Sequence, residues 1–272
     1  MTAAPGIAQR QQPFGEVLRH WREHRRLSQL DLAALAGVSA RHLSFIETGR
    51  STPSRDMVVR LSEWLEVPLR DRNHMLMAAG YAPVYPETTL NAPEMSAVRD
   101  ALRQLLTGHE PFPAAVVDRN WNLVDSNSCF GLFTDGVAPE LLAPPVNALR
   151  LSLHPLGLAP RIANIGQWRA YQLNKLARRV SLTGDRTLAA LYDELCSYGC
   201  EQPQPDVVFP DDGDILVPLR VRHRNDEYAL FCTVTTFGMP LDITLAELAI
   251  ETFYPADNRT GELLARRRAI RS

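Results

Sequence analysis

Lysine and cysteine are scarce in this chain of 272 residues. Lys175 is the single lysine among 29 basic residues, and there are four cysteines. Four cysteines in a chain of this length are typical of a reduced cytoplasmic protein and argue against a disulfide framework. Arginine therefore carries nearly all of the positive charge, and its planar guanidinium is well shaped for forked contacts with phosphate or guanine.

Long hydrophobic runs are also missing. No apolar stretch approaches the roughly 18–20 residues that a membrane-spanning helix needs. The first residues, MTAAPGIAQRQQPFGEV, lack the basic start and apolar core of a secretory signal. Hydrophobic residues make up 45% of the chain and charged residues 22%, as in globular proteins. We expect a soluble cytoplasmic protein without a membrane partner, built from one large domain or two ordinary domains.

Motifs for catalysis and metal binding are not found in the sequence. Nothing resembles a glycine-rich phosphate loop or a nucleophile elbow. Cys196 and Cys200 stand near each other, but no second Cys or His pair follows at the spacing of zinc ligands. The acidic run DDGD at 211–214 lacks the downstream glutamate of a calcium loop. We therefore expect no enzyme activity, no catalytic residue, no cofactor and no metal site.

The net charge of −2 hides an uneven distribution along the chain. Residues 1–80 hold 11 arginines and 8 acidic residues, a net charge of +3, whereas the remainder has a net charge of −5. A mildly basic first part before an acidic body indicates a division of labour. The basic part is the one suited to a polyanion such as double-stranded DNA.

Five short helices are predicted in the first part. Phe14, Val17, Leu18 and Trp21 recur at helical spacing and give the first helix one apolar stripe. Serines at N-cap positions and glycines after the last turns set the ends of several others. The predicted ranges after the first helix are 29–36, 40–48, 55–65 and 70–79.

A proline-rich stretch, YAPVYPETTLNAPE, separates this part from an α+β part. Two strands are predicted in PAAVVDRNWNLVDSN, and in the last strand Glu247 and Glu251 face away from Leu248 and Ile250. This order of strands and helices along the chain predicts a small sheet domain of PAS-like form. The predicted helices span 94–106, 162–180 and 186–198, and the closing strands span 215–222, 228–236 and 245–254.

The stretch LSQLDLAALAGVSARHLSFIETGR contains residue types that a helix–turn–helix requires. Ala33 is small where two helices cross, and Gly37 permits a left-handed turn. Val38, Leu43 and Ile46 supply an inward face. Ala40, Arg41, Ser44 and Phe45 then point outward near one end of the third helix.

These residues resemble the XRE type of helix–turn–helix, the lambda-repressor and Cro-like group. The resemblance implies that the third helix enters the major groove of DNA. Arg41 would fork onto guanine, and Ala40 and Phe45 would offer apolar contact, for instance to thymine methyl groups. It also implies phosphate contacts from Gln29 and Arg50, and a buried ion pair between Arg22 and Glu47 that ties the first helix to the third. The whole predicted DNA-binding set is Gln29, Ser39, Ala40, Arg41, Ser44, Phe45 and Arg50.

The similarity extends beyond the helix–turn–helix. VSARHLSFIETGRSTPSRDMVVRLSEWLEVPLRDRNHMLMAAGYAPVY resembles the head of the MmyB-like transcription regulators, and PAAVVDRNWNLVDSN and LHPLGLAPRIANIGQW resemble their second domain. This likeness covers about residues 10–268. It implies a DNA-binding domain at 10–80, a linker with a connecting helix at 81–110, and a PAS-like ligand-binding domain at 111–268.

Membership of that family implies a bacterial regulator, dimeric, whose second domain holds a small apolar, fatty-acid-like molecule. Such a site needs an apolar cavity with a few convergent polar groups. The candidate ligand-binding residues are Arg119, Phe130, Phe133, Leu153, His154, Asn164, Ile165, Trp168, Phe231 and Phe253.

Other interpretations stay open from the sequence alone. Arg41 taken by itself reads as a surface arginine, Phe45 fits packing within the domain equally well, and each ligand candidate fits a plain core or surface role. The second domain could be an enzyme that the head tethers to DNA. It could also serve only for dimerisation or protein interaction.

Overall fold

The computed structural model describes residues 13–204 and 217–271. The predicted features at 211–215 lie outside the described residues. Contacts within the chain divide it into two compact units: unit 1 is 1–88 with 239–246, and unit 2 is 89–238 with 247–272. No described helix is both long enough and apolar enough to cross a bilayer.

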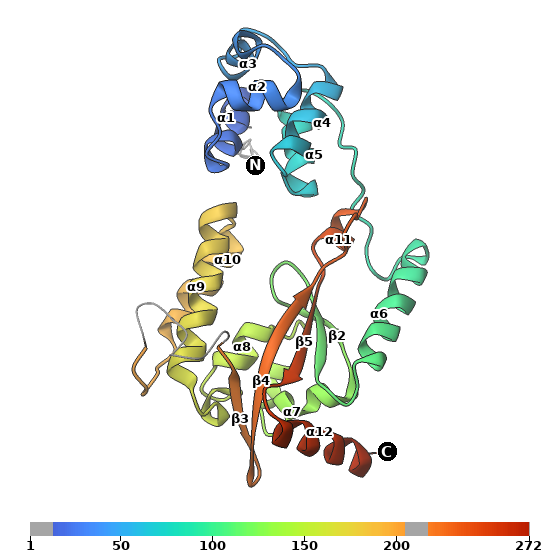
Figure 1. The fold of residues 1–272 in the computed structure, drawn as a ribbon, viewed down its shortest axis with the longest axis vertical. Helices are drawn as coiled ribbons and strands as arrows, with labels where there is room; N and C mark the ends of the chain where they lie inside the picture. The colour runs from blue at the N-terminus through green and yellow to red at the C-terminus, as the bar shows by residue number, and fades with distance from the viewer. Residues whose placement is uncertain (1–12, 205–216, 272) are drawn as a thin grey trace, which may run out of the picture. The chain divides into compact units, whose positions relative to one another are not determined.

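Unit 1 is built from helices, and the predicted all-α, five-helix class is confirmed. Leu18, Leu32, Leu43, Leu61 and Met75 are fully buried in its core. A short sixth helix, α11 (Ile243–Ala246), is contributed by the 239–246 segment. The five helices (Figure 1) are α1 (Phe14–His24), α2 (Gln29–Ala36), α3 (Ala40–Glu47), α4 (Arg55–Trp64) and α5 (Leu69–Ala78).

The first half of the predicted linker is hydrogen-bonded to α5. The buried amide of Asn73 donates to the Tyr85 carbonyl at 2.8 Å and accepts from the Val84 amide at 2.9 Å. Farther along, the Thr88 amide donates to Asp242 Oδ2 at 3.0 Å. Residues 81–88 therefore extend unit 1 and are not a free tether.

Unit 2 is a five-stranded antiparallel sheet with helices on both sides, so the predicted α+β class is confirmed; its PAS-like description stays a prediction. The strands run in the order β2-β1-β5-β4-β3. They are β1 (Ala114–Val117), β2 (Leu123–Ser126), β3 (Leu219–His223), β4 (Asp226–Thr235) and β5 (Ala249–Pro255). The helices are α6 (Ser96–Gly108), α7 (Gly131–Thr134), α8 (Ala148–Leu153), α9 (Ile165–Thr183), α10 (Arg186–Ser197) and α12 (Asn258–Arg271), with a 3₁₀ turn η4 (Ala159–Arg161).

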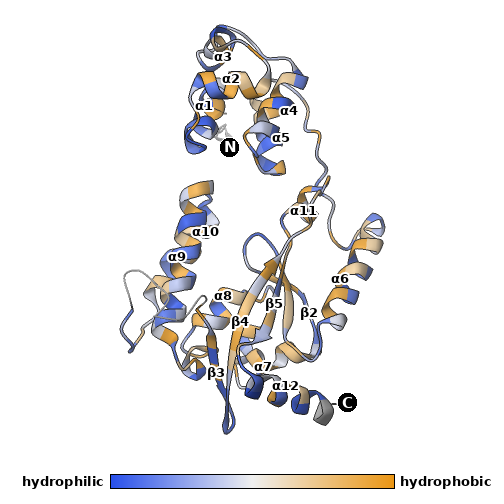
Figure 2. Ribbon diagram, in the orientation of Figure 1, coloured by the Kyte–Doolittle hydropathy of each residue, from blue (hydrophilic) through white to orange (hydrophobic). Residues whose placement is uncertain are grey.

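The central strand β5 is covered on both faces. Phe253 belongs to the main core of unit 2, which also contains Trp168 and Leu176 of α9 and Leu191 of α10. Side chains along a strand alternate between its two faces. Ile250, three residues before Phe253, therefore points to the opposite face of the sheet, where it is also buried. Helix α6 packs along β1, on the other side of the sheet from α9 and α10 (Figure 1). Hydrophobic and hydrophilic residues alternate along the helices of both units (Figure 2), as expected for elements with one buried face.

The strand predicted at 245–254 is wrong at its start. Helix α11 occupies part of that range, and β5 begins only at Ala249. Ile243 is 3% exposed, and its amide donates to the Pro86 carbonyl at 2.8 Å within unit 1. The segment therefore buries its apolar residues by folding onto 86–88, which a period-two pattern in the sequence does not reveal.

Gly15 marks the closest approach of α1 to α3. A Cβ atom at this position would lie 2.4 Å from the Glu47 carbonyl oxygen and 2.7 Å from that of Ile46. We predict that Gly15→Ala destabilises unit 1 by about 1–3 kcal/mol, because the backbone of α3 must shift. Hydrogen-exchange mass spectrometry should show faster exchange in 14–47. Gly108→Ala, where a Cβ meets no atom within 4 Å, serves as the control, and equal exchange in both variants would contradict the close packing.

Candidate functional site

Helices α2 and α3 form a helix–turn–helix whose ends are fixed by local hydrogen bonds. The Ser28 side chain accepts from the Asp31 amide and the Asp31 carboxylate accepts from the Ser28 amide, a reciprocal capping box. Gly37 ends α2 with φ +68°, and the Ser39 hydroxyl accepts from the His42 amide to start α3. Ser39 is thus an N-cap as well as a predicted DNA contact. The tight turn leaves the first turn of α3 accessible.

Phe45 of α3 lies between two arginines, Arg41 on the same helix and Arg50 just after it. The guanidinium carbon of Arg41 lies 5.3 Å from the centre of the Phe45 ring, and that of Arg50 lies 5.9 Å from it. Both arginines are exposed, and neither forms an ion pair with a carboxylate among residues 13–204 and 217–271. A cation beside an aromatic face at an exposed site gains about 0.5–1 kcal/mol. The ring therefore holds two uncommitted cations ready for an anionic or guanine partner.

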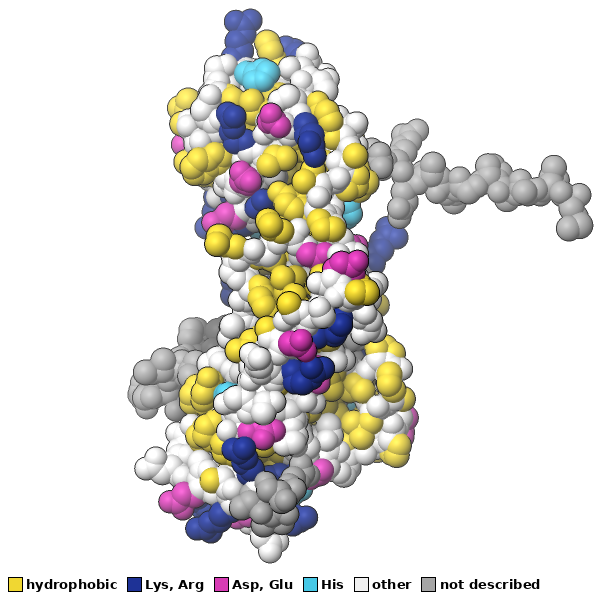
Figure 3. All heavy atoms as spheres, turned by 90° about the vertical axis from the view of Figure 1, so that its right-hand side faces the viewer, with side chains coloured by type: hydrophobic (Ala, Val, Ile, Leu, Met, Phe, Trp, Pro, Cys, Tyr) yellow, Lys and Arg dark blue, Asp and Glu magenta, His cyan; other side chains and the backbone are white. Residues whose placement is uncertain are grey.

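The remaining predicted contacts surround this cluster. Ser39 is exposed, and Ala40 and Ser44 are half-exposed on the same helix. On the face shown in Figure 3, the basic side chains of the described residues stand among acidic and hydrophobic ones and form no continuous stripe. On this face, charge alone does not single out a DNA-binding surface.

The Glu47 carboxylate is the centre of a hydrogen-bond network beneath α3. Its side chain is 0% exposed, and it accepts from Arg22 Nε at 2.6 Å and Arg22 Nη2 at 3.2 Å. Arg22 Nη1 also donates to the Leu27 carbonyl at 2.8 Å, just before α2. The pair expected from the resemblance is thus brought together in bidentate geometry, which joins α1, the α1–α2 loop and α3.

Gln29 has a second role that the sequence did not reveal. Its Nε2 donates to Glu47 Oε2 at 2.8 Å, and Arg19 Nε lies 3.5 Å from the same oxygen. Burial raises the pKa of Glu47, but the hydrogen bonds from Arg22 and Gln29 outweigh burial and leave the pKa below its ordinary value. Gln29 therefore supports the charge on Glu47, and its phosphate contact stays a prediction.

Unit 2 contains a narrow apolar cavity of about 40 Å³ between the sheet and its helices. Phe130, Phe133, Trp168 and Phe253 line it, as the sequence analysis expected for a ligand site. The rings of Phe133 and Phe253 are 4.7 Å apart, centre to centre. This volume is far below the roughly 300–1,000 Å³ of typical small-molecule sites, so a larger ligand must displace side chains.

Three polar residues that were not predicted from the sequence also line this cavity. Ser152, Gln172 and Glu251 line it, and Trp168 Nε1 donates to Ser152 Oγ at 2.9 Å. Burial raises the pKa of Glu251, although Lys175, whose Nζ lies 3.9 Å from the carboxylate, lowers it. The alternation of β5 could have placed Glu251 on the same face as Phe253, because residues two apart share a face.

The other ligand candidates lie outside the cavity lining. Leu153 and Ile165 belong to the surrounding core. The four remaining candidates have partners elsewhere. Arg119 pairs with Asp185 at 2.6 Å, His154 Nδ1 accepts from the Leu156 amide, Asn164 bonds Pro218 and Arg220, and Phe231 stacks on Tyr254 at 5.3 Å.

Two family models match the chain, and together they span both units. The model described as "MmyB-like transcription regulator ligand binding domain" matches residues 98–266. The model described as "Helix-turn-helix domain" matches residues 13–75.

Individual relatives match part of the chain. An uncharacterized HTH-type transcriptional regulator, RghRB of Bacillus subtilis (strain 168), is 36% identical over 83 residues, 30% of this chain and 58% of its own. The HTH-type transcriptional repressor RghR of the same organism is 41% identical over 69 residues, 25% of this chain and 49% of its own. The chain thus spans about half the length of the curated relatives that it matches. The restriction-modification controller protein C.AhdI from Aeromonas hydrophila is 30% identical, with a TM-score of 0.21, over 22% of this chain and 89% of that one.

The Glu47 network predicts a pH-dependent stability of unit 1. The pKa of Glu47 is lowered on folding, so its stabilisation is fully present above the unfolded pKa of about 4.3 and is lost as pH falls through the folded pKa. Glu47→Gln should cost about 3–5 kcal/mol at pH 7, because the buried Arg22 then keeps only the exposed carboxylate of Glu23, 3.4 Å away, as a charged partner. Hydrogen exchange of 14–47 at pH 7 and pH 4 measures both effects.

The variant should also lose less stability than the wild type between the two pH values. Glu16→Gln is the matched control, because Glu16 is an exposed acid on α1. A Glu47→Gln protein as stable as this control at pH 7 would show that the network does not hold the unit together.

Proposed function

This chain belongs to the MmyB-like transcription regulators, and from that premise we propose that it binds one operator sequence as a homodimer and senses a fatty-acid-like ligand. It is a DNA-binding transcription regulator with a helix–turn–helix and a ligand-binding domain. Within the proposal the DNA-binding domain spans 10–80, the linker and connecting helix 81–110, and a PAS-like ligand-binding domain 111–268. The protein would act in the cytoplasm, where bacterial DNA is accessible.

The arginine pair on Phe45 is the observation that carries the DNA-binding proposal. Arg41 lies in the first turn of α3, where a recognition helix meets base edges. Its guanidinium can donate two hydrogen bonds to guanine O6 and N7, while Arg50 and Gln29 are placed to contact phosphates. Ser39 and Ser44 add hydroxyl groups, and Ala40 offers a methyl group.

A single short recognition helix contacts few base pairs, and this favours binding as a dimer. Helix α3 has eight residues, and Arg41 is its only outward-facing residue with a strong hydrogen-bonding preference for one base. Two copies on a roughly palindromic operator double the contacts, with half-sites about one helical turn or a multiple of it apart.

The apolar cavity supports a ligand with an acyl chain. Its lining is aromatic and aliphatic, with Ser152, Gln172 and Glu251 as polar groups that could orient a head group. Because the cavity holds about 40 Å³, an acyl chain can enter only if side chains or helices move. Ligand binding would then favour a different arrangement of unit 2, which is what regulation by a ligand requires.

Chain connectivity offers a route from the cavity to the DNA-binding unit. Residues 239–246 belong to unit 1 but are covalently continuous with β4 and β5. They are held within unit 1 by the Thr88–Asp242 and Ile243–Pro86 hydrogen bonds. A movement of β5, which carries Phe253 and Glu251 of the cavity lining, would therefore pull on unit 1.

We predict that Arg41→Ala lowers the preference for the best operator over single-base variants about 10-fold, since a forked guanine contact is worth about 1–3 kcal/mol. Arg50→Ala should weaken binding to specific and random DNA alike, and reduce the salt slope by about 1. Fluorescence anisotropy on a selected operator measures both. Arg103→Ala removes an exposed arginine from α6 and should change neither; an Arg41→Ala protein that behaves like it would contradict base reading.

For the ligand, we predict that native mass spectrometry of freshly purified protein detects a retained acyl-chain molecule that dissociates on denaturation. Ala148→Phe should lose it, because Ala148 lines the cavity and a larger side chain fills the space that the ligand needs. Empty wild-type protein would favour a second domain that serves only dimerisation. Conversion of the bound molecule would favour an enzyme.

A further inference from the structure

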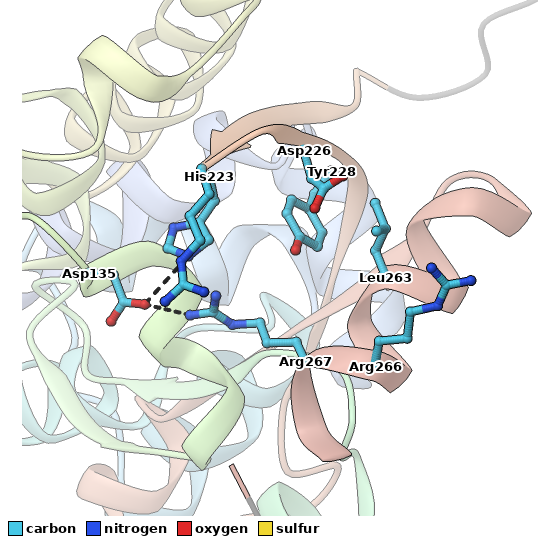
Figure 4. Close-up of a pocket in the computed structure, with 8 residues that line it drawn as sticks. Asp135, His223, Asp226, Tyr228, Leu263, Arg266 and Arg267 are labelled. Atoms are coloured by element: carbon cyan, nitrogen blue, oxygen red, sulfur yellow. Dashed lines mark hydrogen bonds and ion pairs between the residues drawn. The ribbon is translucent and has the colours of Figure 1, made fainter. Parts of the chain in front are cut away.

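A second cavity in unit 2 shares no lining residue with the apolar one and plays no part in the proposed function. It measures about 370 Å³ and lies between the β3–β4 turn, helix α12 and Asp135 after α7 (Figure 4). Arg224, Arg266, Arg267 and His223 line it with Tyr228 and Leu263. Its volume falls in the range of about 300–1,000 Å³ that is typical of small-molecule sites.

Arginines give this cavity an excess of positive charge. Arg267 pairs with Asp135 at 2.5 Å, and Arg266 lies 3.8 Å from Glu262 in a mostly exposed pair. Arg224 stands at the β3–β4 turn and forms no ion pair with any carboxylate among the described residues. Asp226 also lines the cavity, and Arg161 lies beside His223. Four guanidinium groups therefore stand with three carboxylates, those of Asp135, Asp226 and Glu262. One further negative group would balance the charges.

The protonation of His223 can be assigned from its neighbours. Arg161 Nη1 lies 3.2 Å from His223 Nδ1. A guanidinium only donates, so Nδ1 must accept, and the proton of the neutral ring is then on Nε2. Burial, together with the charge of Arg267, lowers the pKa of His223, although Asp135 raises it. The ring is therefore neutral near pH 7, with an N–H at Nε2.

Two buried donors in this cavity lack acceptors. His223 Nε2 has no hydrogen-bond partner among the described residues, since the nearest carboxylate oxygen, of Asp135, is 3.8 Å away. Arg267 Nε is likewise buried without a partner. His223 is 9% exposed. Buried polar groups in proteins are normally paired, so two unpaired donors in the wall of one cavity point to an acceptor that reaches them when the side chains around them adjust.

We propose that this cavity binds a small organic oxyanion, a carboxylate or phosphate carried on an apolar body. Arg224, Arg267 and His223 supply the donors for the oxyanion, and Tyr228 and Leu263 supply an apolar wall for the body. Guanidinium groups match carboxylate and phosphate with paired hydrogen bonds. The site would let the regulator respond to a second molecule, chemically unlike the apolar ligand.

The test uses the full-length protein and three probes of similar size: phenyl phosphate, benzoate and benzyl alcohol. Calorimetry at constant ionic strength should show saturable binding of one or both anions and none of the alcohol. The stronger anion identifies the oxyanion class. On binding, the NMR-measured pKa of His223 should rise, because an anion joins Asp135 in opposing the charges of Arg161, Arg224 and Arg267.

Two variants separate this site from general attraction of anions. Arg224→Asn keeps the left-handed turn, where asparagine is tolerated at φ +55°, and should weaken binding at least 10-fold; Arg266→Gln should weaken it less. Arg103→Gln, on α6, should change nothing. The proposal is overturned if neither anion saturates, if the alcohol binds equally well, or if Arg224→Asn and Arg266→Gln both bind like the Arg103→Gln control.

Discussion

The buried carboxylate of Glu47 is the constraint on which the DNA-binding unit depends. Its oxygens accept hydrogen bonds from α1 through Arg22 and from α2 through Gln29, while its own backbone belongs to α3. Gly15 lets α1 approach the same end of α3 closely. With α3 fixed from below, Arg41 and Phe45 on its outer face and Arg50 just after it are held in one arrangement. Removing the charge would leave buried donors unpaired and loosen α3 first.

Features set by neighbouring residues could be predicted from the sequence. The serine caps, the Gly37 turn and the apolar periodicity of α1 are local, and the predicted helices α1 to α4 match the observed ones closely. Contacts between distant residues could not be predicted. The bond from Gln29 to Glu47 links two helices. The fold of 239–246 onto 86–88 needs a partner about 150 residues away.

At the apolar cavity, too, some lining residues could be predicted from the sequence and others could not. Aromatic residues at 130, 133, 168 and 253 could be chosen as candidates because they are large and apolar. Glu251 was assigned only to the face away from Ile250, since the sequence does not show that β5 is central and covered on both sides. Its carboxyl group lies against the cavity beside Lys175. The structure thus places in the wall of the apolar cavity an acid that the sequence assigned only to one face of a strand.

The proposed regulation requires that the apolar cavity and the operator be coupled, because this coupling joins the two units in one function. The most direct test is the operator affinity of the same protein preparation, measured after removal of bound lipid and again after reloading with a saturated fatty acid. We expect the two dissociation constants to differ by about 5-fold or more, the lower end of usual allosteric couplings. Equal affinities in the empty and loaded protein would contradict the coupling.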